Sequence, residues 1–208
     1  MPLFEGGLRI WAVIFYNYTM TAEQALKQLV AGNLRYVAGT PKHVNVSRGL
    51  RTNLYKKGQK PYAVIIGCSD SRVPVELVFD TGPGELFVIR SAGNVVGPMG
   101  RASLEFAVME FKTPLIIVLG HQSCGAVRAA VDGGEFPPSI QALIQEIQSC
   151  TPTSPCANPY EACEDEHIRQ TVAKIAKYSF VTKAASEGAV RLFAAKYSLE
   201  TGLVSFFE

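Results

Sequence analysis

Two stretches of the sequence share a pattern in which an apolar run of strand length ends in a glycine followed by a soft metal ligand. Residues 62–66 lead through a glycine to Cys68, and residues 115–119 lead through a glycine to His121, with Cys124 three positions later. Short apolar runs of this kind are typical of buried parallel strands. If the two strands are parallel neighbours, their carboxyl ends place the two cysteines and the histidine around one crevice, where open α/β sheets bind their ligands.

The segments between and after these strands indicate a βαβ arrangement. Residues 85–90 predict a third buried strand, and apolar residues at helical spacing over 101–111 predict the helix that crosses back to the second ligand-bearing strand. Residues 189–197 and 203–207 flank a turn and predict a hairpin-like ending. No internal repeat or interdomain linker is found, which favours a single α/β domain.

The first predicted helix has clear start and stop signals. Thr21 and Gln24 have the spacing of a capping box, and Gly39 is the expected stop. Further helices are predicted over 125–131, 140–147 and 161–178. Residues 40–60 show little apolar periodicity and predict a connector, and residues 151–159, with three prolines, predict a loop.

The composition limits the kinds of partner. With 208 residues, 48% of them apolar and 18% charged, the chain has the size and balance of one soluble globular domain. Twenty basic and 18 acidic side chains give a net charge of +2, and no long basic run occurs, so we expect neither nucleic acid nor an anionic membrane as partner. Small neutral or singly charged molecules are compatible with this balance.

The amino-terminal residues differ in character from the rest. Residues 1–19 include an apolar run that is shorter than the roughly 20 residues a membrane-spanning helix needs, and they lack a basic start and a small-residue cleavage site. We therefore expect no membrane span and no signal peptide. The expected division is an arm or extension over 1–19, packed on its own domain or on a partner subunit, and a catalytic domain over 20–208.

Five cysteines are too few for a disulfide-built scaffold in a chain of this size. We therefore expect a reducing, cytoplasmic setting. Cys150, Cys156 and Cys163 fall in one loop-like stretch, where their spacing permits a local disulfide under oxidation. Their distance from the two motifs predicts no part in catalysis.

The remaining cysteines, with one histidine, indicate a metal. A single buried cysteine usually acts as a small hydrophobic residue. The His-x-x-Cys pair of His121 and Cys124, joined by Cys68 at a second strand end, instead favours zinc, one ion per chain. Two thiolates and one imidazole leave a fourth position open, as in catalytic zinc sites. Such zinc lowers the pKa of its water to roughly 7 and supplies hydroxide at neutral pH.

Polar residues near Cys68 suggest how the hydroxide is oriented. Asp70 and Arg72 form either a solvated ion pair of little consequence or, beside a dication, a pair in which the arginine orients the carboxylate toward zinc-bound hydroxide. A narrow, mostly apolar pocket suits a small electrophile, with walls from Phe87 and Ala92 and an amide donor from Gln59. His43 and His167 are interpreted as ordinary surface residues; a proton-shuttle role for His43 is the alternative.

Three stretches closely resemble the signature sequences of β-class carbonic anhydrases. They are CSDSRVP at 68–74, GELFVIRSAGN at 84–94 and GHQSCGA at 120–126. The resemblance runs from residues 31–36 to residues 197–204 and leaves out mainly 1–19 and the cysteine-containing loop. It implies a zinc lyase that interconverts carbon dioxide and bicarbonate, with four parallel strands and an antiparallel fifth, assembled as a homodimer or a multiple of dimers.

The resemblance also implies a role for each site residue. Cys68, His121 and Cys124 match the family's zinc ligands, and Asp70 and Arg72 match its catalytic dyad. Substrate contacts are implied for Gln59, often across the dimer, for Phe87 and Ala92 in the pocket wall, and for the backbone amide of Gly125.

Two other functions are compatible with the same residues. Carbonyl sulfide and carbon disulfide hydrolases are similar in fold and zinc site, and the motifs do not separate them from carbonic anhydrases. A non-catalytic zinc or redox module is the other alternative, although it would have no need for Asp70, Arg72 and Gln59.

The resemblance admits two resting states for Asp70. Either Arg72 holds the carboxylate and water completes the zinc, or the carboxylate binds the metal and closes the site. Forms that close commonly carry a tryptophan three residues before the first cysteine ligand, where this sequence has Ile65. We therefore expect the open state.

Overall fold

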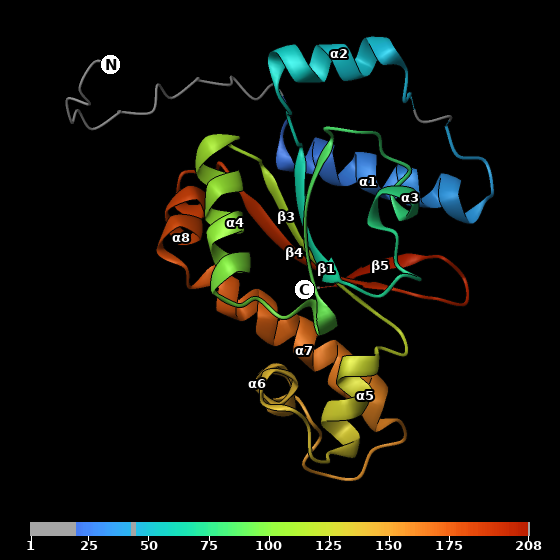
Figure 1. The fold of residues 1–208 in the computed structure, drawn as a ribbon, viewed down its shortest axis with the longest axis vertical. Coiled ribbons are helices and arrows are strands. Elements are labelled where there is room, and N and C mark those ends of the chain that lie inside the picture. Colours follow the sequence, from blue (N-terminus) through green and yellow to red (C-terminus); the bar gives the residue numbers. More distant parts are fainter. Residues whose placement is uncertain (1–19, 43–44, 208) are drawn as a thin grey trace, which may run out of the picture.

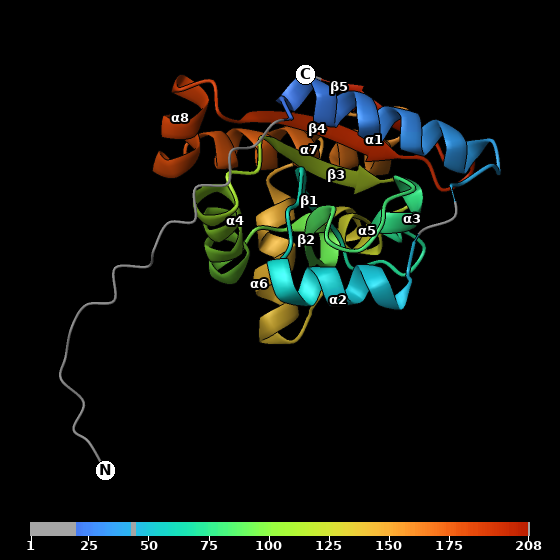
Figure 2. The ribbon, with the colours of Figure 1, turned by 90° about the horizontal axis from the view of Figure 1, so that it is seen from above.

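The computed structural model describes residues 20–42 and 45–207. They form one five-stranded sheet with helices on both faces, as Figures 1 and 2 show. The strand order is β2-β1-β3-β4-β5, with the first four parallel and β5 antiparallel to β4. The strands are β1 (Ala63–Cys68), β2 (Leu86–Ser91), β3 (Leu115–His121), β4 (Arg191–Tyr197) and β5 (Val204–Phe207). The predicted mostly parallel sheet is confirmed.

The helices follow the strands in the predicted βαβ order. They are α1 (Ala22–Val37), α2 (Arg48–Lys57), α3 (Val75–Val78), α4 (Pro98–Glu110), α5 (Gly125–Asp132), α6 (Pro138–Gln148), α7 (Pro159–Ala176), α8 (Ser179–Ser186) and the short 3₁₀ turn η1 (Ala92–Asn94). The capping box of α1 is confirmed, because Thr21 and Gln24 each accept a hydrogen bond from the other's backbone N–H.

The core lies on both faces of the sheet because β1 and β3 are fully buried central strands. Successive residues of β1 point to opposite faces: Ile65 packs with Leu29 of α1, and Ile66 packs with Leu104 of α4. Direct pairing of β1 with β3 brings their carboxyl ends side by side. These two ends carry the predicted ligands.

The predicted connector over 40–60 is wrong, because it contains helix α2. No residue of α2 is buried, so the helix has no apolar stripe from which it could be predicted. Its start is set locally by Ser47, whose hydroxyl accepts a hydrogen bond from the Leu50 N–H. Helix α8 also lies in a segment for which no element is predicted.

Within the described residues, no helix is both long enough and apolar enough to cross a membrane. The expected arm over 1–19 and the alternative proton shuttle His43 lie outside the described residues.

Candidate metal centre

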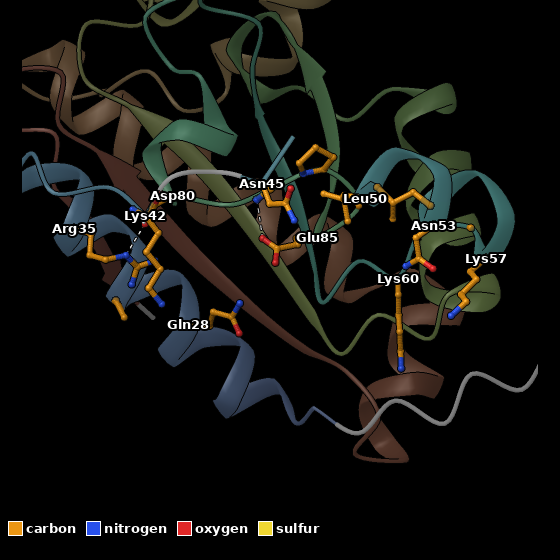
Figure 3. Close-up of a pocket in the computed structure, with 16 residues that line it drawn as sticks. Gln28, Arg35, Lys42, Asn45, Leu50, Asn53, Lys57, Lys60, Asp80 and Glu85 are labelled. Carbon is orange, nitrogen blue, oxygen red and sulfur yellow. Dashed lines mark hydrogen bonds and ion pairs between the residues drawn. The ribbon is translucent and has the colours of Figure 1, made fainter. Parts of the chain in front are cut away.

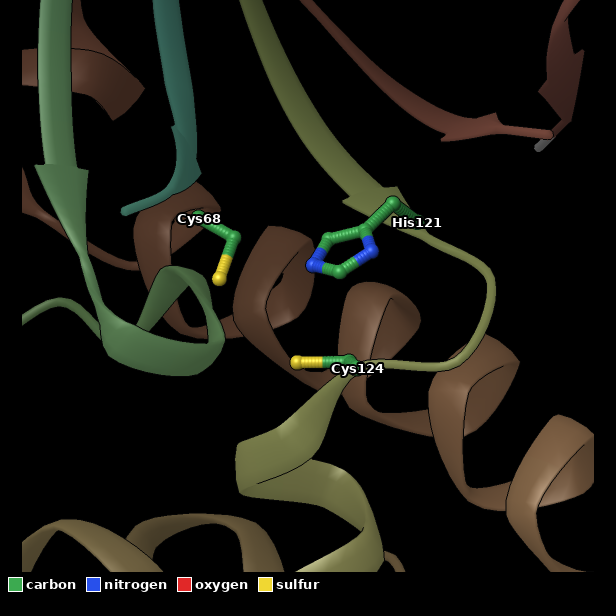
Figure 4. A group of neighbouring side chains, drawn as sticks. All are labelled: Cys68, His121 and Cys124. Atoms are coloured by element: carbon green, nitrogen blue, oxygen red, sulfur yellow. The ribbon is translucent and has the colours of Figure 1, made fainter. Parts of the chain in front are cut away.

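The structure gathers the three predicted ligands at one edge of the sheet. Cys68 is the last residue of β1, His121 is the last residue of β3, and Cys124 is the residue that caps the start of α5. Their ligand atoms all lie within 4.8 Å of one another, and Figure 4 shows the two sulfurs and the imidazole facing a common point. All three side chains are buried.

The hydrogen bonding of His121 fits a metal ligand. Its Nδ1 lies 2.8 Å from the Gln122 carbonyl, which only accepts, so Nδ1 carries the hydrogen. The other ring nitrogen, Nε2, then presents a lone pair, and it is buried without a hydrogen-bond partner. A buried lone pair without a hydrogen-bond partner is costly, and a cation held between it and the two sulfurs would satisfy it. The donor set suits zinc.

The electrostatics of the two thiols also favour a cation. A hydrogen bond from Cys124 lowers the pKa of Cys68 below its usual value, and the backbone N–H of Gly93 donates to the Cys68 sulfur at 3.3 Å. The neighbouring Cys68 sulfur raises the pKa of Cys124. The surroundings therefore favour one thiolate in the pair, and a bound cation would favour the second.

Asp70 and Arg72 form a bidentate pair beside the three ligands. The Arg72 guanidinium donates to the two carboxylate oxygens at 3.0 and 2.7 Å, and its backbone N–H donates at 2.9 Å. These hydrogen bonds lower the pKa of Asp70 to about 2. One carboxylate oxygen lies 3.9 Å from Nε2 of His121. In this geometry Arg72 holds the carboxylate next to the cluster.

Arg90 supports this arrangement although it was not predicted from the sequence. Its guanidinium donates to the backbone carbonyls of Cys68 at 2.8 Å and Asp70 at 2.7 Å. Because Cys68 ends β1 and Asp70 lies in the turn that follows, one side chain fixes the backbone that carries a ligand and the acidic residue. Its position near the end of β2, a half-buried strand beside the predicted crevice, is the signal that could have identified it.

Comparison with known proteins identifies the family. Residues 63–204 match the family model described as carbonic anhydrase. The chain belongs to the carbonic anhydrase family. It is 37% identical over 185 residues to carbonic anhydrase 2 of Mycobacterium tuberculosis, covering 86% of this chain and 89% of that protein. It is 38% identical over 189 residues to a carbonic anhydrase of Mycolicibacterium smegmatis, covering 86% and 90%.

Solved structures agree with this assignment. The β-carbonic anhydrase CcaA superposes with a TM-score of 0.68 at 26% identity, covering 88% of this chain and 87% of that one. A Coccomyxa β-carbonic anhydrase in complex with acetazolamide has the same fold, with a TM-score of 0.68 at 23% identity over 88% and 86% of the two chains.

Two of the predicted substrate residues lie beside the metal centre of this carbonic anhydrase. Ala92 follows β2 and directly precedes Gly93, whose amide contacts the Cys68 sulfur. Gly125 follows Cys124 as the first residue of α5, and a Cβ added there would meet no atom within 4 Å. Both residues are exposed, so a small molecule has access to them.

The other two predicted substrate residues are not brought to the centre. Gln59 is exposed and precedes β1, whereas Cys68 ends that strand, so the six-residue strand separates them by about 20 Å. Phe87 pairs in register with Val64 near the amino end of β1, and its ring packs on Phe111 with centroids 5.9 Å apart. Within one chain, neither side chain belongs to the group around Cys68.

Cavities lie at both ends of the sheet. One of about 540 Å³ borders the metal centre through Cys124 and Arg72. Another of about 890 Å³ lies between α1, α2 and the turn before β2, and Figure 3 shows Arg35 and Asp80 at one side and Lys60 at the other. The second cavity contains no member of the Cys68 cluster. It lies at the end of the sheet where Gln59 is located.

The interpretation of His167 as a surface residue is wrong. His167 is buried in α7, with Nε2 2.7 Å from the Gly93 carbonyl and Nδ1 3.8 Å from the Cys150 sulfur. The loop assigned to the three cysteines is wrong for Cys163, which is buried within α7. Cys150 does lie in the turn after α6 ends, although it is buried, and Cys156 is exposed in the loop. His167 and Cys163 face the interior because α7 packs against β3, β4 and α5, and a local sequence pattern does not reveal that packing.

Proposed function

We propose that the catalytic centre of this carbonic anhydrase is one zinc ion per chain held by Cys68, His121 and Cys124. The protein is an enzyme of the lyase class, a carbonate dehydratase, and its reaction is the reversible hydration of carbon dioxide to bicarbonate and a proton. The observation that carries the proposal is the buried, unpartnered Nε2 of His121 facing two thiols. When bound, zinc supplies hydroxide at neutral pH by lowering the pKa of water to roughly 7.

Asp70 orients the nucleophile. Its carboxylate is ionised and held by Arg72, so it accepts a hydrogen bond from the attacking oxygen and fixes the direction of the oxygen's lone pair. Arg72 is itself anchored by a hydrogen bond of 3.1 Å to the Ser123 carbonyl, between the histidine and cysteine ligands. Arg72 therefore connects the segment after Cys68 with the segment between His121 and Cys124, and this holds Asp70 in place beside the centre.

Ala92 and Gly125 receive the substrate. The apolar Ala92 side chain lines the place where carbon dioxide binds. Because carbon dioxide is uncharged, it needs few polar contacts there. The Gly125 amide lies at the amino end of α5, where backbone N–H groups and the helix dipole favour an anion such as bicarbonate. Substrate and product thus meet different groups in one small space.

Gln59 and Phe87 act on the site of a second copy of the chain, assembled as a homodimer or a multiple of dimers. The rings of Phe87, Phe111 and Phe106 pack in sequence, with centroids 5.9 and 5.5 Å apart, and Phe106 is 52% exposed. Met99 and Met109 on the same helix are also exposed, which leaves an apolar face for a subunit to cover. A β-carbonic anhydrase of Sordaria macrospora with the same fold is described as tetrameric; its TM-score is 0.67 at 19% identity over 76% of this chain.

We also propose that residues 20–208 form the catalytic domain and that the enzyme works in the cytoplasm. The described residues share one sheet and continuous packing on its two faces, which supports the single domain. The five cysteines are free thiols, and the ligand pair has to remain reduced to bind zinc, which supports a reducing compartment.

Stopped-flow hydration of carbon dioxide, with zinc content measured on the same samples, tests the assignment. We expect activity to follow bound zinc and to be lost with a chelator. The Cys124→Ala variant should lose tight zinc binding and more than about 1,000-fold of its activity, because removing a ligand removes the centre. Cys156→Ser is the matched control and should retain both. Full zinc content and activity in Cys124→Ala would contradict the ligand assignment.

A further inference from the structure

Helix α7 buries two ionisable side chains directly behind the metal centre. Glu164 and His167 lie three residues apart on the buried face of the helix, with 5% and 4% of their surface exposed. The helix packs on β3, β4 and α5, and Figure 1 shows it passing next to α5. Burying polar groups on the core-facing surface of a helix costs free energy unless hydrogen bonds or ion pairs compensate for the lost contact with water. Glu164 contacts the backbone of the ligand Cys124, and His167 contacts Gly93, which itself contacts the ligand Cys68.

Glu164 contacts the segment that carries Cys124. One carboxylate oxygen accepts a hydrogen bond from the Cys124 backbone N–H at 3.3 Å, and the other pairs with Lys196 at 2.9 Å. The ammonium group of Lys196 also forms an ion pair with Asp165, at 2.8 Å. A buried ion pair of this kind contributes little net stability, so stability alone does not account for it. Its geometric effect is to fix the backbone of Cys124 at the start of α5.

His167 contacts the segment that supports Cys68. Its Nε2–H donates to the Gly93 carbonyl at 2.7 Å, and the N–H of the same glycine donates to the Cys68 sulfur at 3.3 Å. Gly93 has a φ of +61°, and an added Cβ would come within 2.7 Å of Ile147. Only glycine fits there. The imidazole therefore holds a glycine whose amide points at a ligand sulfur.

The third ligand is approached by the neighbouring residue of α7. A Cβ on Gly120 would lie 2.4 Å from the Ile168 side chain, so the helix and strand β3 are in close contact immediately before His121. One face of one helix thus reaches the backbone next to Cys68, His121 and Cys124. Groups outside a metal's ligand set that orient the ligands commonly affect its affinity.

We propose that Glu164 and His167 are positioning residues that set the geometry and affinity of the metal centre. Glu164 fixes Cys124 through its amide, and His167 fixes the hydrogen bond that Cys68 receives. Neither residue touches substrate. The inference rests on the proposed ligand assignment and adds a function for α7 that the ligands alone do not require.

Cobalt binding tests the proposal without relying on activity. The purified full chain is depleted of metal and titrated with Co²⁺, whose visible absorption reports thiolate ligation and geometry, and affinity is measured by competition with a chromophoric chelator. We expect Glu164→Gln to bind Co²⁺ about tenfold more weakly, with an altered visible spectrum, because a neutral amide oxygen accepts a weaker hydrogen bond from the Cys124 N–H than the carboxylate does. His167→Leu should show a similar loss, and His167→Gln, which keeps an N–H donor, should recover most of it.

Matched controls separate positioning from general damage to the helix. Glu166→Gln removes the same charge two residues away, on an exposed side chain, and should leave affinity and spectrum unchanged. Lys196 keeps Asp165 as a partner in Glu164→Gln, so we expect that variant to fold. The neutral pair Glu164→Gln with Lys196→Gln is the second variant, and it should show the same loss of affinity.

The outcomes distinguish this inference from the proposed function. Wild-type affinity and spectrum in both Glu164→Gln and His167→Leu would overturn the inference while leaving the ligand assignment in place. An equal loss in Glu166→Gln would also overturn it, because the effect would then be one of helix stability. Absence of cysteine-dependent Co²⁺ absorption in the wild type would overturn the ligand assignment and this inference together.

Discussion

At the carboxyl end of the sheet the proposed ligands are buried and held by several segments, whereas at the amino end Gln59 and the whole of α2 lie at the surface. The first region gathers two strand ends, η1, α5 and α7 around Cys68. The second has an exposed amide and a helix without a buried residue. A single chain therefore supplies the metal centre but leaves Gln59 without a site to act on. This difference supports the proposal that a second subunit completes the substrate pocket.

Mixed assemblies test this comparison most severely. Gln59→Ala should lose about 100-fold in activity, because a substrate hydrogen bond is removed, and Cys124→Ala should lose more. When both chains are co-expressed, mixed dimers combine the metal centre of one chain with the glutamine of the other. Random pairing should then restore about a quarter of wild-type activity. The measurement is hydration by stopped flow on the purified mixture.

The control for complementation is the same mixture made from separately purified chains that have not exchanged subunits. It should show only the low activity of Gln59→Ala. If co-expressed chains gain nothing over this control, Gln59 acts in its own chain or not at all, and the contrast between the two ends of the sheet loses its functional meaning.

A smaller effect is expected from Arg72, which lies at the carboxyl end and is 53% exposed. Arg72→Ala should release Asp70 to bind the metal and lower activity by about 10- to 100-fold, because the carboxylate no longer orients the nucleophile. Arg128→Ala is the matched control: Arg128 lines the same cavity but stacks on Tyr160. Equal activity of Arg72→Ala and wild type would show that the bidentate pair is a surface feature only.

The contrast between the two regions also explains what could be predicted from the sequence. The strand ends and their ligands could be predicted because an apolar run, a glycine and a ligand are adjacent in the sequence. His167 and Cys163 were misplaced because their burial depends on α7 packing across distant strands. Helix α2 was missed because none of its residues is fully buried, so it has no clear apolar stripe. The separation of Gln59 from Cys68 could be predicted, because a strand lies between them in the sequence. A contact between Gln59 of one chain and the metal centre of another depends on how two chains assemble, and the sequence pattern of one chain does not give that.

The buried and exposed cysteines give a third, moderate test. Cys163 is buried in α7, so Cys163→Ser buries a hydroxyl in place of a less polar thiol. We expect this to lower the free energy of unfolding by about 1–3 kcal/mol. Cys156→Ser, in the exposed loop, should change stability by less than about 0.5 kcal/mol. Turnover of the folded, zinc-loaded proteins should stay at the wild-type level in both. Urea unfolding and hydration assays check the two expectations, and a large loss of turnover in either variant would assign the cysteines a catalytic part.

The smallest expected effect concerns acid stability at the carboxyl end. The pKa of Asp70 is lowered to about 2 from an ordinary value of 3.8, chiefly by its hydrogen bonds with Arg72. A lowered carboxyl pKa contributes stability above the unfolded-state value, and the contribution is lost as the pH falls from about 4 toward 2. Because the pair borders solvent, we expect about 1 kcal/mol.

In metal-free protein, urea unfolding should show wild type more stable than Arg72→Ala near pH 6, with the gap closing by pH 2. Metal-free protein is needed because a bound cation would change the charge that Asp70 experiences. Arg128→Ala serves again as control, since it removes an equal charge without touching Asp70. A gap for Arg72→Ala that stays constant from pH 6 to pH 2 would mean that the arginine stabilises the fold by packing, and that the carboxylate is not held by its charge.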